Sequence, residues 1–349
     1  MSRRQEGQGR GAGAVATRRF RSAWRLGVWL LLAGCGGGGR IPLVVYSPHG
    51  RDLLTLMERR FEAAHPGVDV RWLDMGSQEA LDRVRSERAN PQADVWFGGP
   101  ASLFATAARD SLLAPLEGDS VFWLSVYRTP AVIAYNRAAV PDSAAPRDWD
   151  DVLAPRWKDR ILIRDPMASG TMRAIWGMFF ERSLAATGDT AQGAAWLRRL
   201  DGQTREYVQN PALMTEKLVR QEGWITLWDL PDLQITIRRG RDLGYVFPAS
   251  GTPVIDDAVA VVRGSSHAEL ARAFVDFVRS PAMQILAARE AYRLPARTDL
   301  PADSLPAWVR QVNATMKAAP MDWAQLDRNG AAWMAYWDRH IRGTGKAGS

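Results

Sequence analysis

The chain has 349 residues, of which 46% are hydrophobic, which is enough for a sizeable core and two domains. Its formal net charge is +7, but residues 1–34 contain seven arginines and a single glutamate, so the rest of the chain is close to neutral. A near-neutral body lacks the basic surface that binds nucleic acid, and we therefore expect no nucleic-acid partner.

The first 34 residues have the pattern of a targeting segment. A basic stretch, Arg18-Arg19-Phe20-Arg21, precedes the apolar run LGVWLLLAG, which is too short to span a bilayer. The run ends in LLAGC, which resembles the lipobox of bacterial lipoproteins. This resemblance implies that residues 1–34 are a signal peptide and that Cys35, the only cysteine, is lipidated. The alternative is a buried free thiol that follows an ordinary signal peptide.

Residues 35–40 contain four glycines after the cysteine, a composition typical of a flexible tether. Together with the lipobox they predict a membrane-anchored lipoprotein in the periplasm or on the cell surface. The folded body is expected to begin at residue 41.

Three strand–helix units open the body. LVVYS and ADVWFGG are continuous apolar runs and VDVRWLD alternates, and each is followed by helical periodicity. Ser77 stands at the predicted N-cap of the second helix, and Pro100 stands in the first turn of the third. Three such units in a row predict a parallel sheet with helices on its faces.

The second half of the body suggests another α/β lobe. TPAVIAYNR (129–137) and TPVIDDAVAVV (252–262) are apolar runs that we expect to cross between the lobes, with strands and helices of a second sheet between them. The predicted lobe 1 consists of residues 41–130 and 256–349, including the C-terminal helices, and lobe 2 of residues 131–255. Two crossing strands then form a hinge, with a ligand cleft between the lobes.

Four loops precede helices at the carboxyl ends of predicted strands: SPHG, MGS, GGP and MASGT. Ligands of open α/β sheets bind at this edge, and the first turn of a helix offers unpaired N–H groups to an anion. Glycines let the backbone approach a ligand and hydroxyls can donate to it, although the same residues also form ordinary turns. The candidate ligand-binding residues of these loops are Ser47, His49, Gly50, Gly76, Ser77, Gly98, Gly99, Ser169, Gly170 and Thr171.

Three further candidates lie near the lobe crossings. Asp229 and Asp256 are expected to face the cleft and to hold an amine or hydroxyl groups, and Trp228 can form a wall beside them. Alternatively, Asp229 caps the helix that begins at Pro231, and Asp257 is a solvated partner of Asp256. We assign no metal ligand and no cofactor.

Over nearly the whole mature chain the sequence resembles the solute-binding proteins of bacterial ABC importers, most closely the ferric-iron-type branch. The stretch from LVVYSPHG to ADVWFGGPASLF carries the resemblance, as do LAPRWKDRILIRDPMASGT and AVAVVRGSSHAELARAFVDFVRSPAMQ. It implies a two-lobed periplasmic-binding-protein fold that closes on a ligand and docks on a membrane permease driven by an ATPase.

The resemblance departs from the iron-binding members at three positions. Their adjacent tyrosines fall near Leu230-Pro231 in this chain, their carboxylate ligand falls at Gly99, and their histidine is displaced by one position from His49. Ferric iron prefers hard anionic oxygen ligands, which these residues do not supply. We therefore predict a phosphonate, a phosphorylated sugar or a carboxylate as the solute.

The resulting prediction is a monomeric solute-binding lipoprotein that captures a small anionic solute by hinge closure and delivers it to an ABC permease. The alternatives are a ferric iron binding protein and, ranked lower, a ligand-sensing lipoprotein or a secreted hydrolase. The sequence has no GxSxG and no HExxH motif, and its four histidines lie in four different segments, so we expect no enzyme.

Overall fold

The computed structural model describes residues 39–118 and 120–344, so the predicted signal peptide and Cys35 lie outside the described residues. From Arg40 onward the described chain belongs to one compact unit. None of the helices in this part of the chain combines the length and apolar character that a membrane span needs.

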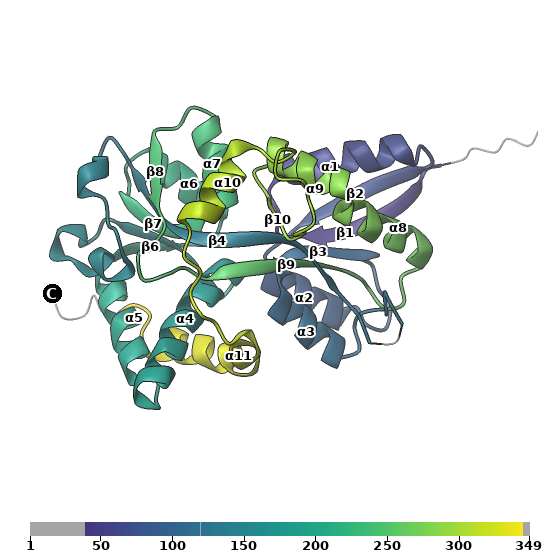
Figure 1. Cartoon of the computed structure of the whole chain (residues 1–349). Coiled ribbons are helices and arrows are strands. Elements are labelled where there is room, and N and C mark those ends of the chain that lie inside the picture. The colour runs from purple at the N-terminus through teal and green to yellow at the C-terminus, as the bar shows by residue number, and fades with distance from the viewer. Residues whose placement is uncertain (1–38, 119, 345–349) are drawn as a thin grey trace, which may run out of the picture. The chain divides into compact units, whose positions relative to one another are not determined.

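The strands follow one another in space in the order β2-β1-β3-β9-β4-β7-β5-β6, and β8 and β10 each pair with β4 (Figure 1). Pairing is parallel among β1, β2 and β3 and among β5, β6 and β7, whereas β4 and β9 run antiparallel to their neighbours. The strand bounds are β1 (Ile41–Ser47), β2 (Val68–Asp74), β3 (Val95–Pro100), β4 (Leu124–Asn136), β5 (Ile161–Arg164), β6 (Thr204–Val208), β7 (Ile225–Asp229), β8 (Leu243–Val246), β9 (Val254–Val261) and β10 (Leu294–Pro295).

Helices lie on both sides of the central strands: α1, α7, α9 and α10 on one side of β4 and β9, and α2, α3, α4 and α11 on the other (Figure 1). The helix bounds are α1 (Arg51–Ala64), α2 (Ser77–Ser86), α3 (Ala101–Arg109), α4 (Gly170–Thr187), α5 (Ala191–Gln203), α6 (Pro211–Val219), α7 (Leu230–Arg238), α8 (Ala268–Arg279), α9 (Pro281–Glu290), α10 (Ala307–Thr315) and α11 (Trp323–His340). Three short 3₁₀ helices span Asp142–Ala144, Trp149–Leu153 and Pro155–Trp157.

The continuous apolar run of β1 is explained by helices on both faces of its sheet. Leu43 and Val45 are buried in a cluster with Met57 and Phe61 of α1. Tyr46 points to the opposite face and is buried with residues of α2 and α3. A strand covered on both faces has no solvent side to keep polar, so hydrophobic periodicity disappears from its sequence.

The second lobe is organised around α4, which is buried on most of its circumference. Trp176, Phe180 and their neighbours belong to the largest hydrophobic cluster, together with β5, β7, α5 and α11. Gly177 leaves room for Leu326 of α11, because a Cβ atom at position 177 would overlap the Leu326 side chain. A helix that is apolar all round is one that its neighbours enclose.

Strand β4 connects the two lobes. Its first half, Leu124–Pro130, pairs with β9, and its second half, Ala131–Asn136, pairs with β7 and β8. Residues 129–137 and 252–262, expected to cross between the lobes, thus contain the C-terminal part of β4, from Thr129 to Asn136, and the whole of β9.

The hydrophobic clusters show where the C-terminal helices pack. Ala271 and Phe274 of α8 and Met283 of α9 belong to the cluster of β1 and α1. Val309 of α10 and Trp337 of α11 belong instead to the cluster of α4 and β5. The lobe boundaries stay a prediction, since the helices of residues 256–349 are shared between the two cores.

Candidate functional site

A cavity of about 340 Å³ lies where strand ends and helix starts converge. Its volume falls in the range of small-molecule sites. The segments before or within the first turns of α2, α3, α4, α6 and α7 line it, and so do residues on β4 and β9. We call this cavity the central pocket.

Nine of the thirteen residues predicted from the sequence line the central pocket: His49, Gly76, Ser77, Gly99, Ser169, Gly170, Thr171, Trp228 and Asp229. The four that do not line it are Ser47, Gly50, Gly98 and Asp256.

Two of those four support His49 instead. The Ser47 hydroxyl accepts a hydrogen bond from the backbone N–H of His49 at 3.2 Å. Gly98 has a positive φ of +100° and leaves the space that the His49 ring occupies, because a Cβ atom there would overlap the ring. Gly50 is the N-cap of α1 and accepts hydrogen bonds from the backbone of Leu53 and Leu54.

Strand alternation on β9 separates Asp256 from Asp257. Asp256 is exposed, whereas Asp257 is buried and lines the pocket. Asp257 accepts hydrogen bonds from Gly99 N at 3.2 Å and from the Thr129 hydroxyl. Because adjacent residues of a strand face opposite sides, only one of the two carboxylates can reach the pocket. The expectation that Asp257 is a solvated partner of Asp256 is therefore wrong.

The helix starts at the pocket are capped in different ways. Ser77 is the first residue of α2 and not its N-cap as predicted; the N-cap is Gly76, which has no side chain to bond the first turn. Ser169 caps α4, with its Oγ accepting from Met172 N at 3.3 Å. Asp229 caps α7, as the alternative reading of this residue held, and it also lines the pocket.

The starts of α2 and α4 touch each other across the pocket. A Cβ atom at position 170 would lie 2.5 Å from the Ser77 Oγ and 2.6 Å from Cδ of Pro100. A Cβ atom at position 76 would lie 2.5 Å from the carbonyl oxygen of Ala168. Both glycines are therefore needed for the two backbones to come this close.

Charged residues that sequence reasoning missed also line the pocket: Asp74, Glu79, Arg164, Asp232 and Arg293. Asp74 and Arg164 are the last residues of β2 and β5, so the rule that ligands sit at the carboxyl ends of strands would have found them. Arg293 follows α9 in a segment without any motif, and no sequence signal marks it.

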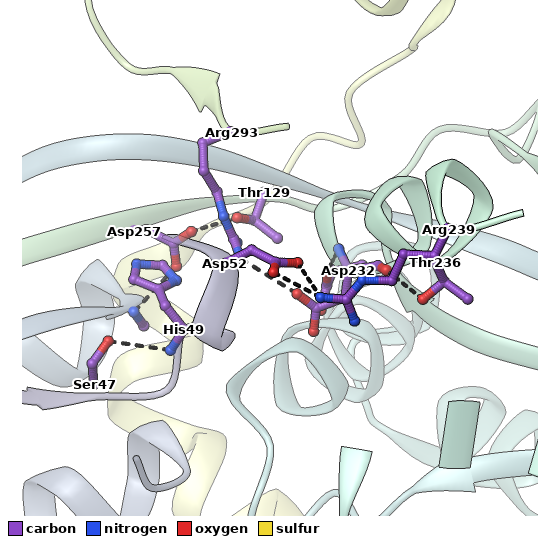
Figure 2. Close-up of polar contacts among 11 residues, drawn as sticks. Ser47, His49, Asp52, Thr129, Asp232, Thr236, Arg239, Asp257 and Arg293 are labelled. Atoms are coloured by element: carbon purple, nitrogen blue, oxygen red, sulfur yellow. Dashed lines mark hydrogen bonds and ion pairs between the residues drawn. The ribbon is translucent and has the colours of Figure 1, made fainter. Parts of the chain in front are cut away.

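Arg293 is the most buried charged side chain of the pocket, at 3% exposure. Figure 2 shows it between Asp257 and Asp232, with His49 and Thr129 nearby. Its Nη2 donates to the Asp232 Oδ1 at 3.3 Å, while its Nε has no hydrogen-bond partner within the described chain.

Burial shifts the pKa values of three groups around Arg293. Burial raises the pKa of Asp257 to about 6, although the Thr129 hydrogen bond and the Arg293 charge oppose the rise. Burial and then the charge of Asp232 raise the pKa of Asp229 well above its ordinary value. Burial and the Arg293 charge lower the pKa of His49, so this imidazole is neutral.

In residues 39–118 and 120–344, no group of three or more His, Cys, Asp and Glu side chains is placed to hold a metal ion. The pocket instead combines helix starts, five carboxyl groups and two arginines. Two lobes joined by shared strands around such a pocket define the class of two-lobed solute-binding proteins.

Comparison with known proteins identifies the family. The model of the bacterial extracellular solute-binding protein family matches residues 43–293, and the chain belongs to this family. A probable ABC transporter periplasmic-binding protein of Sinorhizobium fredii is 26% identical, with 86% of each chain covered. A putative 2-aminoethylphosphonate-binding periplasmic protein of Salmonella typhimurium is 22% identical, covering 67% of this chain and 71% of the relative.

Solved structures show the same fold. The periplasmic binding protein AfuA of Actinobacillus pleuropneumoniae, with exogenous fructose-6-phosphate bound, has a TM-score of 0.75 and 20% identity over 87% of this chain and 99% of its own. Iron-bound HitA of Pseudomonas aeruginosa has a TM-score of 0.69 and 18% identity over 84% and 98%. The predicted two-lobed fold is confirmed, and so is the prediction of a non-enzymatic, periplasmic solute-binding protein of an ABC importer.

Proposed function

We propose that the protein captures a small anionic solute (a phosphonate, a phosphorylated sugar or a carboxylate) and delivers it to an ABC permease. One observation carries this proposal: the starts of α2 and α4, from different lobes, meet at one pocket. Each start presents backbone N–H groups and a partial positive charge, which together suit an anion. We call Gly76, Ser77, Ser169, Gly170 and Thr171 the helix-start group.

Two arginines add positive charge to the same pocket. Arg164 and Arg293 are 7% and 3% exposed, so both are shielded from water and interact strongly with a charged ligand. Relatives of similar fold are named for a phosphonate or carry a bound phosphosugar, and both ligands contain the group that helix starts favour.

The proposed cycle begins with solute bound to one lobe while the lobes are apart. Closure then brings the helix start of the second lobe onto the same anion, and the closed form docks on the permease. We further propose that the protein acts as a monomer and is held at the membrane through a lipid on Cys35.

Ferric iron remains the alternative solute. The positions that the resemblance assigns to the iron-ligating tyrosines, Leu230 and Pro231, are the first two residues of α7 and both are buried. Neither offers an oxygen from its side chain, which is why the anionic solute is proposed first.

The proposal is tested by thermal melting of the full chain with a panel of solutes: inorganic phosphate, 2-aminoethylphosphonate, hexose phosphates, dicarboxylates, neutral sugars, polyamines and ferric citrate. A solute at ~100 times its Kd stabilises the folded state by about 2.7 kcal/mol and raises the melting temperature by a few degrees. A shift with neutral sugars, polyamines or ferric ion only, and with none of the anions, would refute the proposal.

A double variant tests the helix-start group directly. Ser169→Ala with Thr171→Ala should reduce the shift given by the binding anion, because two hydroxyls at the start of α4 are removed. Ser169 also caps its helix, so Ser280→Ala is the matched control: Ser280 caps α9 with the same 3.3 Å hydrogen bond and lies outside the pocket. Each lost cap costs about 1 kcal/mol. An anion-induced shift that is equal in both variants would exclude the helix-start group.

A further inference from the structure

A second group of pocket residues surrounds Arg293, on the side of the pocket formed by α7 and β9. It consists of Arg293, Trp228, Asp229, Asp232 and Asp257, all of which line the central pocket. We call these five residues the Arg293 group. The proposed function places the anion at the helix-start group. A compact anion such as phosphate would therefore leave the Arg293 group without a role in binding.

The Arg293 group contains buried donors without acceptors. Arg293 Nε and Trp228 Nε1 lack a hydrogen-bond partner anywhere in the described ranges, although the two side chains are 3% and 7% exposed. Buried polar groups in folded proteins are bonded with few exceptions, and an exception in a pocket points to a ligand that completes it. The guanidinium makes one long hydrogen bond, to Asp232 at 3.3 Å.

The same group contains acceptors in excess. Three carboxyl groups, Asp229, Asp232 and Asp257, lie around one guanidinium (Figure 2 shows Asp232, Asp257 and Arg293). Asp229 also caps α7, and Asp257 binds Gly99 N and Thr129, but a carboxylate has about four lone-pair positions and so retains acceptor capacity.

The combination of unpaired donors and excess acceptors in the Arg293 group discriminates between three kinds of ligand group. An ammonium ion would satisfy the carboxylates but would be repelled by the buried guanidinium and leave its Nε–H unpaired. A second anionic group would satisfy Arg293 but would be repelled by the surrounding carboxylates. A hydroxyl group donates to a carboxylate and accepts from Arg293 or Trp228, so only hydroxyls satisfy every member of the group.

We propose that the solute is a small phosphorylated or phosphonylated polyol, a sugar phosphate in the simplest case, and that Arg293 is the residue that selects its hydroxyl-bearing part. The inference rests on the proposed function, since the helix-start group holds the anionic end. Arg293 and the carboxyl groups then decide which anion is taken.

The protonation of the carboxyl groups agrees with a neutral ligand part. Burial raises the pKa of both Asp229 and Asp257 above the ordinary value. With a pKa of about 6, Asp257 is ionised at neutral pH and accepts from a ligand hydroxyl. Asp229, whose carboxyl group is disfavoured as an anion, offers an O–H donor as well when it is protonated. An ammonium ligand would need Asp229 ionised as well, in a setting that opposes its ionisation.

The first test is a titration series by calorimetry with the full chain. Fructose 6-phosphate is compared with n-hexyl phosphate, which has the phosphate but no hydroxyls, with 2-aminoethylphosphonate, and with inorganic phosphate. We expect the sugar phosphate to bind at least about tenfold more tightly than each of the other three, because each leaves buried donors or acceptors of the Arg293 group unpaired. Equal or tighter binding of any of the three overturns the inference.

The second test uses Arg293→Gln and Arg293→Lys, with Arg289→Gln as the control. Arg289 lies four residues earlier on α9, is exposed and is not part of the pocket. Both Arg293 variants should lower the affinity for fructose 6-phosphate by about tenfold or more and change that for inorganic phosphate by less than about threefold. Arg289→Gln should change neither. Equal losses for both ligands would show that Arg293 acts on charge or stability only.

The outcomes separate this inference from the proposed function. If 2-aminoethylphosphonate or n-hexyl phosphate binds best, the anion site stands and the polyol is wrong. If none of the phosphate-bearing or phosphonate-bearing probes binds, but a neutral sugar or ferric citrate does, the proposed function fails and the inference fails with it. The wild-type series decides between these cases even if the Arg293 variants do not fold.

Discussion

Glu181 on α4 illustrates how burial acts on a single residue. Its side chain is buried, its Oε2 accepts from the backbone N–H of Asp322, and its Oε1 has no partner among the residues described. Burial raises the pKa of Glu181 to about 7, against the lowering effect of that hydrogen bond. The carboxyl group also joins α4 to the start of α11, so its ionisation bears on the packing of the last helix.

We expect the stability of the protein to fall as pH rises from about 4.5 to about 7, partly because of Glu181. The unfolded state releases this proton at the ordinary glutamate pKa and the folded state releases it near pH 7. Between these values the folded state binds more protons, and the free energy of unfolding decreases with pH.

Glu181→Gln should remove that part of the pH dependence and stabilise the protein by about 1–2 kcal/mol at pH 8, because no buried charge forms. Urea unfolding of the variant and the wild type at pH 5 and pH 8 measures both the pH dependence and the gain in stability. Glu269→Gln is the control, since Glu269 is exposed on α8 and should leave the slope unchanged. If the free energy of unfolding changed equally with pH in the wild type and in Glu181→Gln, the pH dependence could not be assigned to Glu181.

At the scale of the element, β9 decides which of two adjacent aspartates reaches the ligand. Its antiparallel pairing with β3 and β4 fixes the register, with Asp257 opposite both Pro100 and Tyr127 and Asp256 opposite Arg128. A shift of one residue would exchange the two faces, so the register determines the chemistry of the pocket.

Asp257→Asn should weaken solute binding by about tenfold, because the amide cannot accept from Gly99, Thr129 and a ligand hydroxyl as the carboxyl group does. Asp256→Asn, the same change one residue earlier, should leave affinity unchanged. Calorimetric titration with fructose 6-phosphate and with inorganic phosphate compares the two variants. A larger loss in Asp256→Asn would mean that the sequence-based choice of Asp256 was right.

At the scale of the whole molecule, the proposed closure depends on the contact between the starts of α2 and α4. Gly170 meets Ser77 and Pro100 of the other lobe with no room for a side chain. A second link between the lobes is the ion pair of Arg239, the C-cap residue of α7, with Asp52 on α1, at 2.7 Å (Figure 2). This pair is exposed and contributes little to stability, so the close backbone contact is the more demanding requirement.

Gly170→Ala should disfavour the closed form. Its Cβ would lie 2.5 Å from the Ser77 Oγ, whereas alanine suits the first turn of α4 at least as well as glycine does. We expect about tenfold weaker binding of fructose 6-phosphate, a larger radius of gyration by small-angle scattering, and no loss of melting temperature without ligand. Gly67→Ala, where a Cβ has nothing within 4 Å, should change none of these. Unchanged affinity in Gly170→Ala would show that the lobes close without this contact.

The sequence alone determined the local features of this protein. The apolar run of β1, the cap at Asp229 and the glycine-rich loops before helices depend on residues close together in the chain. Their patterns therefore predict the strand–helix order and the edge where the pocket lies. The likeness to a family of solute-binding proteins follows from the same local patterns.

Only the tertiary structure decided which side chains meet in the pocket. The choice of Asp257 over Asp256 depends on strand register, and the place of Arg293 depends on packing between segments 61 residues apart, at the contact with Asp232. The sharing of α8 to α11 between two cores depends on long-range burial in the same way. A sequence pattern records which face of an element is apolar, but not which distant element covers that face, and the ligand contacts are made where distant elements meet.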